Sequence, residues 1–395
     1  MITLDDYRHV APPGTVDMLH RLADRVRGRK LLHVTGGRLG GGAAETLRGA
    51  VPLLSELGLE AAWEITEGEP RYLAAARVLQ AALEGAERVL AEPALERYLE
   101  INRANAGTLP LDADVIVVHD VPPAALVAER RGGTWIWRCH FDCSTPQQGA
   151  WSFFRPLAGR FDAAVYSLPE FAGPLGIPGY VIAPSIDPLS DKNREMPAPE
   201  VERVLGALGV ARDKPLLLQV APLEPGGDPL GTINAYRIVK KHHDVRLVLA
   251  GAAGDGDGAE VTRELREAAT QDPDIVVLEL PTEAHRQINA LQRAATIVLQ
   301  KSARDASGLG AAEALWKGKP VIASVTGALP QLVIHEVTGY LVRSPEGAAF
   351  RVRQLLNNRE LIARLGATGR EHVRRGFLLT RQILDYLALV TRVTL

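Results

Sequence analysis

Two carboxylates, Asp305 and Glu313, flank the start of an expected helix in the stretch SARDASGLGAAEALWKGKP, residues 302–320. Small residues, among them Ser307 and Gly308, fill the loop that leads into this helix. A helix start offers free backbone N–H groups and the positive end of the helix dipole, and small side chains let a ligand approach them. The stretch therefore fits a pocket for a phosphate and a sugar, or the remnant of such a pocket.

A second loop of this kind lies in HVTGGRLGGGAAETLRGAVPLLSELG, residues 33–58, between an expected strand and a helix. Gly40, Gly41 and Gly42 remove side chains where the backbone must come close to another group. The helix start would bind a phosphate or a sugar hydroxyl. The spacing is not GxGxxG, so a flexible strand-to-helix turn is the alternative interpretation.

The stretch TWIWRCHFDCS places Cys139, His140, Asp142 and Cys143 at the end of an expected strand, and all four residue types can bind metals. Side chains alternate along a strand, so the cysteines would share one face while His140 and Asp142 point to the other. We therefore expect no metal site. His140 and Asp142 would hydrogen-bond a polar ligand, and a buried histidine satisfied by backbone is the alternative.

Short apolar segments alternate with amphipathic helical stretches, which is typical of parallel sheets covered on both faces. The expected strands form two sets: 30–35, 114–120, 134–140, 162–167 and 180–185, then 215–221, 245–251, 274–280, 296–300 and 320–324. The pattern predicts an α/β protein with two Rossmann-like, doubly wound halves facing a cleft. Ligands would bind at the carboxyl ends of the strands.

The polar, proline-containing segment between the two sets has no periodicity and is typical of a linker. We expect an N-terminal domain at residues 1–187, a hinge at 188–200 and a C-terminal domain at 201–375. A C-terminal helix over 376–395 would cross back to the N-terminal domain.

The composition of the 395 residues excludes several classes of protein. A formal net charge of -2 argues against a nucleic-acid-binding face. No apolar segment is long enough to span a membrane, and the acidic, proline-broken N-terminus does not fit a signal peptide. Two cysteines cannot form a disulfide framework, so we expect a cytoplasmic protein.

Six stretches together resemble the trehalose glycosyltransferring synthases, retaining glycosyltransferases of the GT-B fold within family four. They are WIWRCHFDCSTP, FDAAVYSLPEF, APSIDPLSDKNRE, DPLGTINAYRIVK, INALQRAATIVLQKS and EALWKGKPVIAS. The resemblance implies transfer of glucose from a nucleotide sugar, held mainly by the second half, to a sugar acceptor held mainly by the first. It implies no metal or other cofactor, and family members often form homodimers.

The resemblance also implies roles for single residues. His140 would contact the transferred sugar, the glycine loop would approach the donor phosphate and the acceptor, and Glu313 would bind the nucleotide ribose. The loop that closes on sugar and phosphate contains Arg304, Asp305, Ser307, Gly308 and Leu309. Asp305 would contact the donor sugar, where the family usually has a glutamate in the sequence EGFGL.

A larger departure is that Pro222 and Gly227 stand where the family has an arginine and a lysine on the donor diphosphate. One well-placed donor to a developing charge is worth roughly 3–4 kcal/mol, so losing two could cost on the order of 10⁴-fold or more in rate if nothing replaces them. Lys301, Arg304 and Arg138 are candidate replacements. Two alternatives stay open: a catalytically silent pseudo-glycosyltransferase that binds a partner, and a phosphorylase that uses a sugar 1-phosphate.

Overall fold

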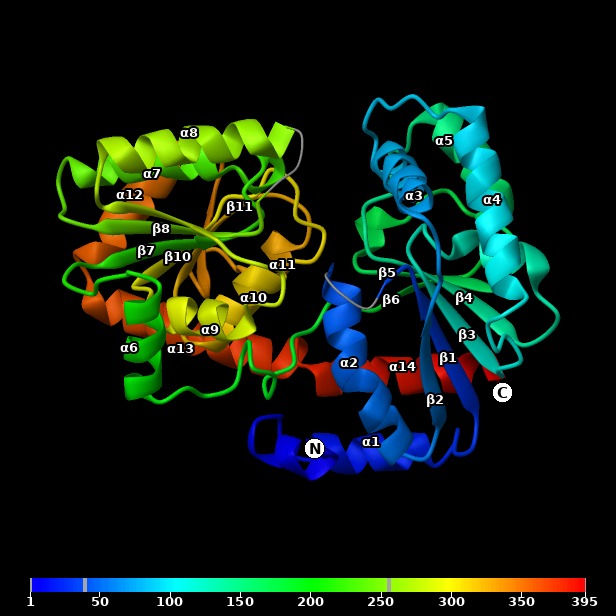
Figure 1. The fold of residues 1–395 in the computed structure, drawn as a ribbon. Coiled ribbons are helices and arrows are strands. Elements are labelled where there is room, and N and C mark those ends of the chain that lie inside the picture. The colour runs from blue at the N-terminus through cyan, green and yellow to red at the C-terminus, as the bar shows by residue number, and fades with distance from the viewer. Residues whose placement is uncertain (1, 38–40, 254–256, 395) are drawn as a thin grey trace. The chain divides into compact units, whose positions relative to one another are not determined.

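The computed structural model describes residues 2–37, 41–253 and 257–394 and divides into two compact units. Unit 1 comprises Met1–Pro184 and Leu379–Leu395, and unit 2 comprises Ser185–Leu378. Each unit is built on a six-stranded parallel sheet flanked by helices (Figure 1). The predicted fold class, two Rossmann-like α/β halves with a C-terminal helix that returns to the first, is confirmed. Within the described ranges, no helix is long and apolar enough to cross a membrane.

The sheet of unit 1 has the strand order β2-β1-β3-β4-β5-β6. Its strands are β1 (Lys30–Thr35), β2 (Glu60–Ile65), β3 (Val115–His119), β4 (Thr134–Cys139), β5 (Ala163–Tyr166) and β6 (Gly179–Val181). Its α-helices are α1 (Thr15–Ala23), α2 (Gly41–Glu56), α3 (Pro70–Leu83), α4 (Glu92–Ala106), α5 (Gln148–Ala158) and α14 (Leu379–Thr394).

The two faces of this sheet differ in character. Trp135 and Trp137 of β4 belong to a hydrophobic core with residues of α3, α4 and α5. The opposite face carries polar residues and is covered by α2 and α14. Arg381 anchors α14, because its guanidinium donates to the backbone oxygens of Ala183 (2.6 Å) and Pro184 (3.2 Å).

The sheet of unit 2 has the order β12-β11-β10-β7-β8-β9. Its strands are β7 (Leu216–Val220), β8 (Arg246–Gly251), β9 (Ile275–Glu279), β10 (Ile297–Gln300), β11 (Val321–Ser324) and β12 (Gly339–Val342). Its α-helices are α6 (Ala198–Ala207), α7 (Pro229–Lys240), α8 (Asp257–Gln271), α9 (His285–Ala294), α10 (Leu309–Trp316), α11 (Leu329–Leu332), α12 (Pro345–Leu356) and α13 (Arg359–Gly376). Apolar residues of α7, α8 and α12 pack with the strands into one core.

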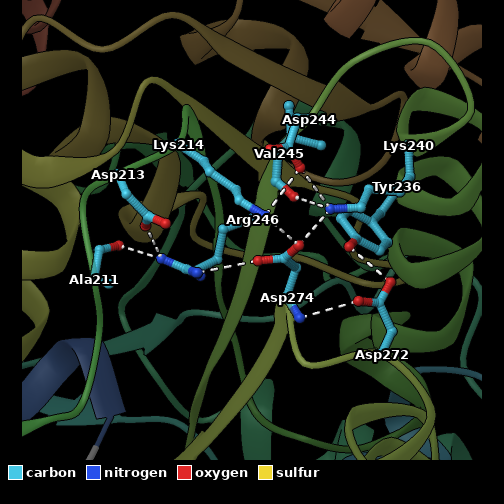
Figure 2. A network of polar contacts seen from close by, with 10 residues as sticks. All are labelled: Ala211, Asp213, Lys214, Tyr236, Lys240, Asp244, Val245, Arg246, Asp272 and Asp274. Carbon is cyan, nitrogen blue, oxygen red and sulfur yellow. Dashed lines mark hydrogen bonds and ion pairs between the residues drawn. The ribbon is translucent and has the colours of Figure 1, made fainter.

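An ionic network closes the amino edge of this second sheet (Figure 2). The Asp274 carboxylate, 10% exposed, binds Lys214 (2.7 Å), Arg246 (3.0 Å) and also Lys240. Burial opposes ionisation of Asp274, but Lys214 and Lys240 outweigh it and lower its pKa to about 2. Because Arg246 begins β8 and Asp274 directly precedes β9, the network lies at the edge opposite to that used for ligands, and its role is structural.

The polar segment expected to be a hinge, residues 188–200, lies within unit 2 and is attached to its helices. Asn289 of α9 donates to the backbone oxygens of Asp191 and Arg194, both at 2.9 Å. Arg293 also donates to the Arg194 oxygen at 2.8 Å. The buried Asn289 amide and the partly buried Arg293 guanidinium thus give fixed positions to a segment that has no helical or strand periodicity.

Candidate functional site

A row of three histidines lies near the carboxyl edge of the unit 1 sheet. His33 Nδ1 is 3.0 Å from His119 Nε2, and His119 Nδ1 is 3.0 Å from His140 Nε2. His33 and His119 are buried, while His140 is partly exposed. Burial lowers the pKa of His33 to about 3, and burial first, then neighbouring positive charge, holds the pKa values of His119 and His140 well below the usual range. All three rings are therefore neutral near pH 7.

Asp120 fixes the backbone at His140. Its Oδ1 accepts the His140 backbone N–H at 2.9 Å, and its own backbone has a left-handed φ of 58°. Burial raises the pKa of the Asp120 carboxyl to about 7, against the opposing His140 hydrogen bond. Aspartate is one of the few residues that tolerate this backbone region, and its presence next to a candidate ligand-binding histidine marks a strained turn at the strand end.

The neighbours of His140 in the sequence make local contacts. The exposed Asp142 carboxylate accepts hydrogen bonds from the backbone (2.9 Å) and hydroxyl (2.6 Å) of Ser144, which closes a local turn. Cys139 and Cys143 are buried with their Sγ atoms 3.9 Å apart. In the described part of the chain, no group of three or more histidine, cysteine or acidic side chains has the arrangement of a metal site.

The second glycine-rich loop leads into α2 in unit 1. Gly41 begins this helix, Gly42 lies in its first turn, and the Gly42 oxygen accepts the Thr46 hydroxyl at 2.8 Å. Gly40 lies outside the described residues. A Cβ atom on Gly36 would lie 2.6 Å from the Pro122 side chain, so the chain needs glycine where it leaves β1. The start of α2 provides the backbone donors expected for an anion or a hydroxyl.

In unit 2, Asp305 organises the loop before α10. Its Oδ1 accepts the Gly308 backbone N–H at 2.7 Å, and its Oδ2 accepts the Gln300 amide at 3.1 Å. Burial raises the pKa of Asp305, although these hydrogen bonds oppose the rise. Both carboxylate oxygens thus hold the loop in shape, and they bring the partly exposed Ser307 and the start of α10 at Leu309 into position.

Gly308 is required by the geometry at the start of α10. Its φ is 65°, and a Cβ atom there would lie 2.3 Å from the Leu332 side chain. The neighbouring Arg304 is exposed, and its backbone N–H lies 3.4 Å from the Gly226 oxygen. The backbone N–H groups of Arg304 and Gly308 thus bond within the protein, and the loop exposes the Arg304 guanidinium at the carboxyl edge of the sheet.

Glu313 is buried in α10, with 1% of its surface exposed. Its Oε1 pairs with Lys192 Nζ at 2.9 Å, and its Oε2 accepts from the Gln292 amide at 3.3 Å. Lys317 lies alongside, donating to Asn193 Oδ1 and Gln292 Oε1, both at 2.8 Å. Burial lowers the pKa of Lys317 to about 7, against the effect of the Glu313 charge.

The candidate replacement cations have different environments. Lys301 is buried and pairs with the Asp228 carboxylate at 2.7 Å. Arg138 is fully buried in unit 1 and donates to the Ile182 oxygen at 2.8 Å. Arg304 makes no side-chain hydrogen bond or ion pair within the described ranges.

At Gly227, where the family has a lysine, a Cβ atom would lie 2.4 Å from the Pro222 backbone oxygen. The loop in this conformation therefore has no room for a side chain at position 227.

Comparison with known proteins identifies the family. The model described as "Trehalose synthase, N-terminal domain" matches residues 33–173, and "Glycosyl transferases group 1" matches residues 202–372. A trehalose synthase from Pyrococcus horikoshii is 36% identical over 97% of this chain and 95% of its own. The chain belongs to the trehalose synthase family. A second member, from Rubrobacter xylanophilus, is 37% identical over 98% of this chain and 96% of its own.

The fold of this trehalose synthase relative also occurs in solved structures of low sequence identity. HepE from Anabaena, solved in complex with UDP and glucose, superposes with a TM-score of 0.67 at 17% identity. The match covers 91% of this chain and 98% of that protein. The family models and the two relatives confirm the resemblance to the trehalose synthases, and this superposition confirms the GT-B fold.

Two groups of residues around the site were not predicted from the sequence. His33 and His119 are hydrogen-bonded into one row with His140, and each stands at or near the end of an apolar strand, which is the available signal. Lys192 pairs with Glu313 from a segment whose polar composition is typical of a linker. No pattern in that segment indicates its partner.

Proposed function

We propose that the chain is a retaining glycosyltransferase that transfers a glucose-like sugar from a nucleotide sugar to a sugar or small-molecule acceptor. The observation that carries the proposal is the similarity to trehalose synthases over both units, at 36–37% identity. The fold shared with a protein solved with UDP and glucose supports a nucleotide-sugar donor.

Unit 2 would bind the nucleotide. The ribose hydroxyls would hydrogen-bond the Glu313 carboxylate, which now pairs with Lys192, so the nucleotide would share or displace that amine. The donor sugar and phosphate would lie against the loop that Asp305 shapes through the Gly308 N–H, near the positive end of the α10 dipole. In unit 1, His140 would bind sugar hydroxyls and the start of α2 would bind a hydroxyl or a phosphate oxygen.

In the reaction, the bond between C1 of the donor sugar and the diphosphate oxygen breaks, and its electron pair leaves with the nucleoside diphosphate. An acceptor hydroxyl oxygen bonds to C1 on the same face. The hydroxyl proton passes to the leaving diphosphate oxygen. The protein's task is to stabilise charge on that diphosphate as it departs.

Arg304 would supply positive charge that Pro222 and Gly227 do not. Its guanidinium is exposed beside the loop, whereas Lys301 is already neutralised by Asp228. The positive end of the α10 dipole would add the remaining stabilisation. We therefore expect Arg304→Ala to lower kcat/KM by about a hundredfold to a thousandfold, the range for losing one donor to a developing charge.

The test uses the purified full chain with UDP-, GDP- and ADP-glucose, each with glucose as acceptor, and identifies products by proton NMR. Formation of an α,α-linked disaccharide with release of nucleoside diphosphate is expected. Calorimetric titration with the three nucleoside diphosphates should show binding that Glu313→Ala abolishes and Glu360→Ala, an exposed change, preserves. No turnover and no binding would overturn the proposal. Phosphate-dependent breakdown of trehalose without a nucleotide would instead assign a phosphorylase.

A further inference from the structure

The three histidines of unit 1 come from neighbouring strands and share one face of the sheet. His33 lies in β1, His119 ends β3 and His140 follows β4, and these strands are adjacent (Figure 1). In register, His33 lies beside Val117 and His119 beside Arg138. Residues two apart on a strand share a face, so all three histidines lie on the same face, each two residues nearer the carboxyl edge than the one before.

Two hydrogen bonds of 3.0 Å link the rings in series. A neutral imidazole has one N–H, so it donates through one nitrogen and accepts through the other. Burial keeps all three rings neutral. The tautomer of His33 therefore sets the tautomer of His119, which sets that of His140.

Only two arrangements satisfy both hydrogen bonds. In the first, His33 donates from Nδ1 to His119, His119 donates from Nδ1 to His140 Nε2, and His140 carries its proton on Nδ1. In the second, every direction is reversed, so His140 carries its proton on Nε2 and His33 also carries its proton on Nε2. His140 Nδ1 is therefore a hydrogen-bond donor in the first arrangement and an acceptor in the second.

The environment of His33 favours the first arrangement. His33 Nε2 is buried and has no hydrogen-bond partner in the described part of the chain. The rings line a small, mostly aliphatic space closed by α2 and α14. A buried N–H donor without a partner is rarer and more costly than an acceptor in the same position. The second arrangement would place such a donor at His33 Nε2, whereas the first leaves only an unused lone pair there.

We propose that His33 and His119 are positioning residues that hold His140 in the Nδ1–H tautomer, so that His140 donates a hydrogen bond from Nδ1 to a ligand oxygen. Within the described residues, nothing hydrogen-bonds His140 Nδ1, which leaves this donor for a sugar hydroxyl. The identity of the ligand rests on the proposed glycosyl transfer, whereas the tautomer does not. Neutral imidazole in water prefers the opposite tautomer, so the protein imposes this one.

The test is ¹⁵N NMR of the ligand-free protein labelled at histidine, in which protonated and bare ring nitrogens have well separated shifts. His372 serves as an internal reference. His372 Nε2 lies 2.8 Å from the Gln331 backbone oxygen, which can only accept, so His372 carries its proton on Nε2. His140 is expected to show the opposite pattern, and its signals are assigned by their loss in His140→Asn.

Two variants of His119 separate positioning from packing. His119→Leu removes the donor to His140 and should return His140 to the Nε2–H tautomer. His119→Asn keeps an amide donor near the Nδ1 position and should preserve the Nδ1–H tautomer. Where transfer activity is measurable, His119→Leu should lower kcat/KM at least tenfold, roughly the value of one hydrogen bond to a ligand, and His119→Asn should restore most of it.

An Nε2–H tautomer for His140 in the unsubstituted protein would overturn the proposal without any variant, so a poorly folding variant leaves it testable. An unchanged His140 tautomer in folded His119→Leu would also overturn it. A protein with the Nδ1–H tautomer but no glycosyl transfer would retain this inference and refute the proposed function, so the two failures are distinguishable.

Discussion

Lys192 and Glu313 form an ion pair of 2.9 Å in which the lysine side chain is 14% exposed and the carboxylate 2% exposed. Lys192 comes from the polar segment after residue 185, and Glu313 comes from the second turn of α10. Gln292 supplies a second contact to the carboxylate. The pair ties an irregular segment of unit 2 to the helix that carries the candidate nucleotide ligand.

Removing either partner alone should destabilise unit 2 strongly, because the other charge stays buried without compensation. We expect Lys192→Met and Glu313→Gln each to cost about 3–5 kcal/mol. The double variant Lys192→Met/Glu313→Gln should lose much less stability than the sum of the two single losses. Urea denaturation of all four proteins measures this coupling. Additive losses would show that the two side chains do not stabilise each other.

Asp228 combines three tasks in unit 2, and two substitutions separate them. It adopts a left-handed φ of 48°, caps α7 by accepting the Gly231 N–H, and neutralises the buried Lys301. Asp228→Asn keeps the cap and tolerates the backbone but leaves Lys301 unpaired. Asp228→Ala loses the cap, the tolerated backbone conformation and the ion pair. It should therefore lower the free energy of unfolding by about 1–3 kcal/mol more than Asp228→Asn does. Equal losses in chemical denaturation would mean that the charge alone matters.

The sheets were predictable because their central strands are continuous apolar segments. Two edge strands were not predicted. β2, with the sequence EAAWEI, is only partly buried and contains one β-branched residue. β12 has four residues and begins with glycine. An edge strand needs fewer apolar residues than a central one, so its periodicity is weak.

The candidate site was predictable only in part, for a different reason. His140 and Asp305 follow expected strands, and strand ends are where α/β sheets bind ligands. The partners of His140 depend on strand order, since His33 and His119 are 86 residues apart and meet only because β1 pairs with β3. Lys192 lies in a segment without helix or strand, so no periodicity relates it to Glu313 of α10.

Asp120 should make the stability of the protein depend on pH. Its pKa is raised by burial to about 7, so the folded state holds a proton that the unfolded state releases at lower pH. The stability that Asp120 contributes is complete below about pH 4 and is lost as the pH rises to about 7. Asp120→Asn removes this titration, keeps an acceptor for the His140 N–H and tolerates the left-handed φ of 58°.

The free energy of unfolding of Asp120→Asn should therefore rise relative to that of the unsubstituted protein. We expect the difference to grow by about 1.4 kcal/mol per pH unit between about pH 5 and 7 and then to level off. Urea denaturation at several pH values measures it. Asp112→Asn, at an exposed position, is the control and should show no such growth. A constant difference between Asp120→Asn and the parent would contradict the assignment.

Substitutions at two adjacent glycines, Gly226 and Gly227, test whether the loop after β7 requires glycine at position 227. A Cβ atom on Gly227 would lie 2.4 Å from the Pro222 backbone oxygen, whereas one on Gly226 would meet only the Glu224 side chain at 3.6 Å. Gly227→Ala should cost about 1–3 kcal/mol because the backbone must move. Gly226→Ala should be neutral or stabilise by up to about 1 kcal/mol through the unfolded chain.

The same reasoning predicts that restoring the family's lysine by Gly227→Lys will not recover a diphosphate contact. The new side chain begins with the same Cβ atom, so the variant should lose at least as much stability as Gly227→Ala and should not gain affinity for nucleoside diphosphates. Thermal unfolding and calorimetric titration of the alanine and lysine variants measure the two effects. A stable Gly227→Lys protein with tighter nucleotide binding would contradict this prediction. It would show that the loop has room for a lysine at position 227 and that the backbone does not exclude the cation.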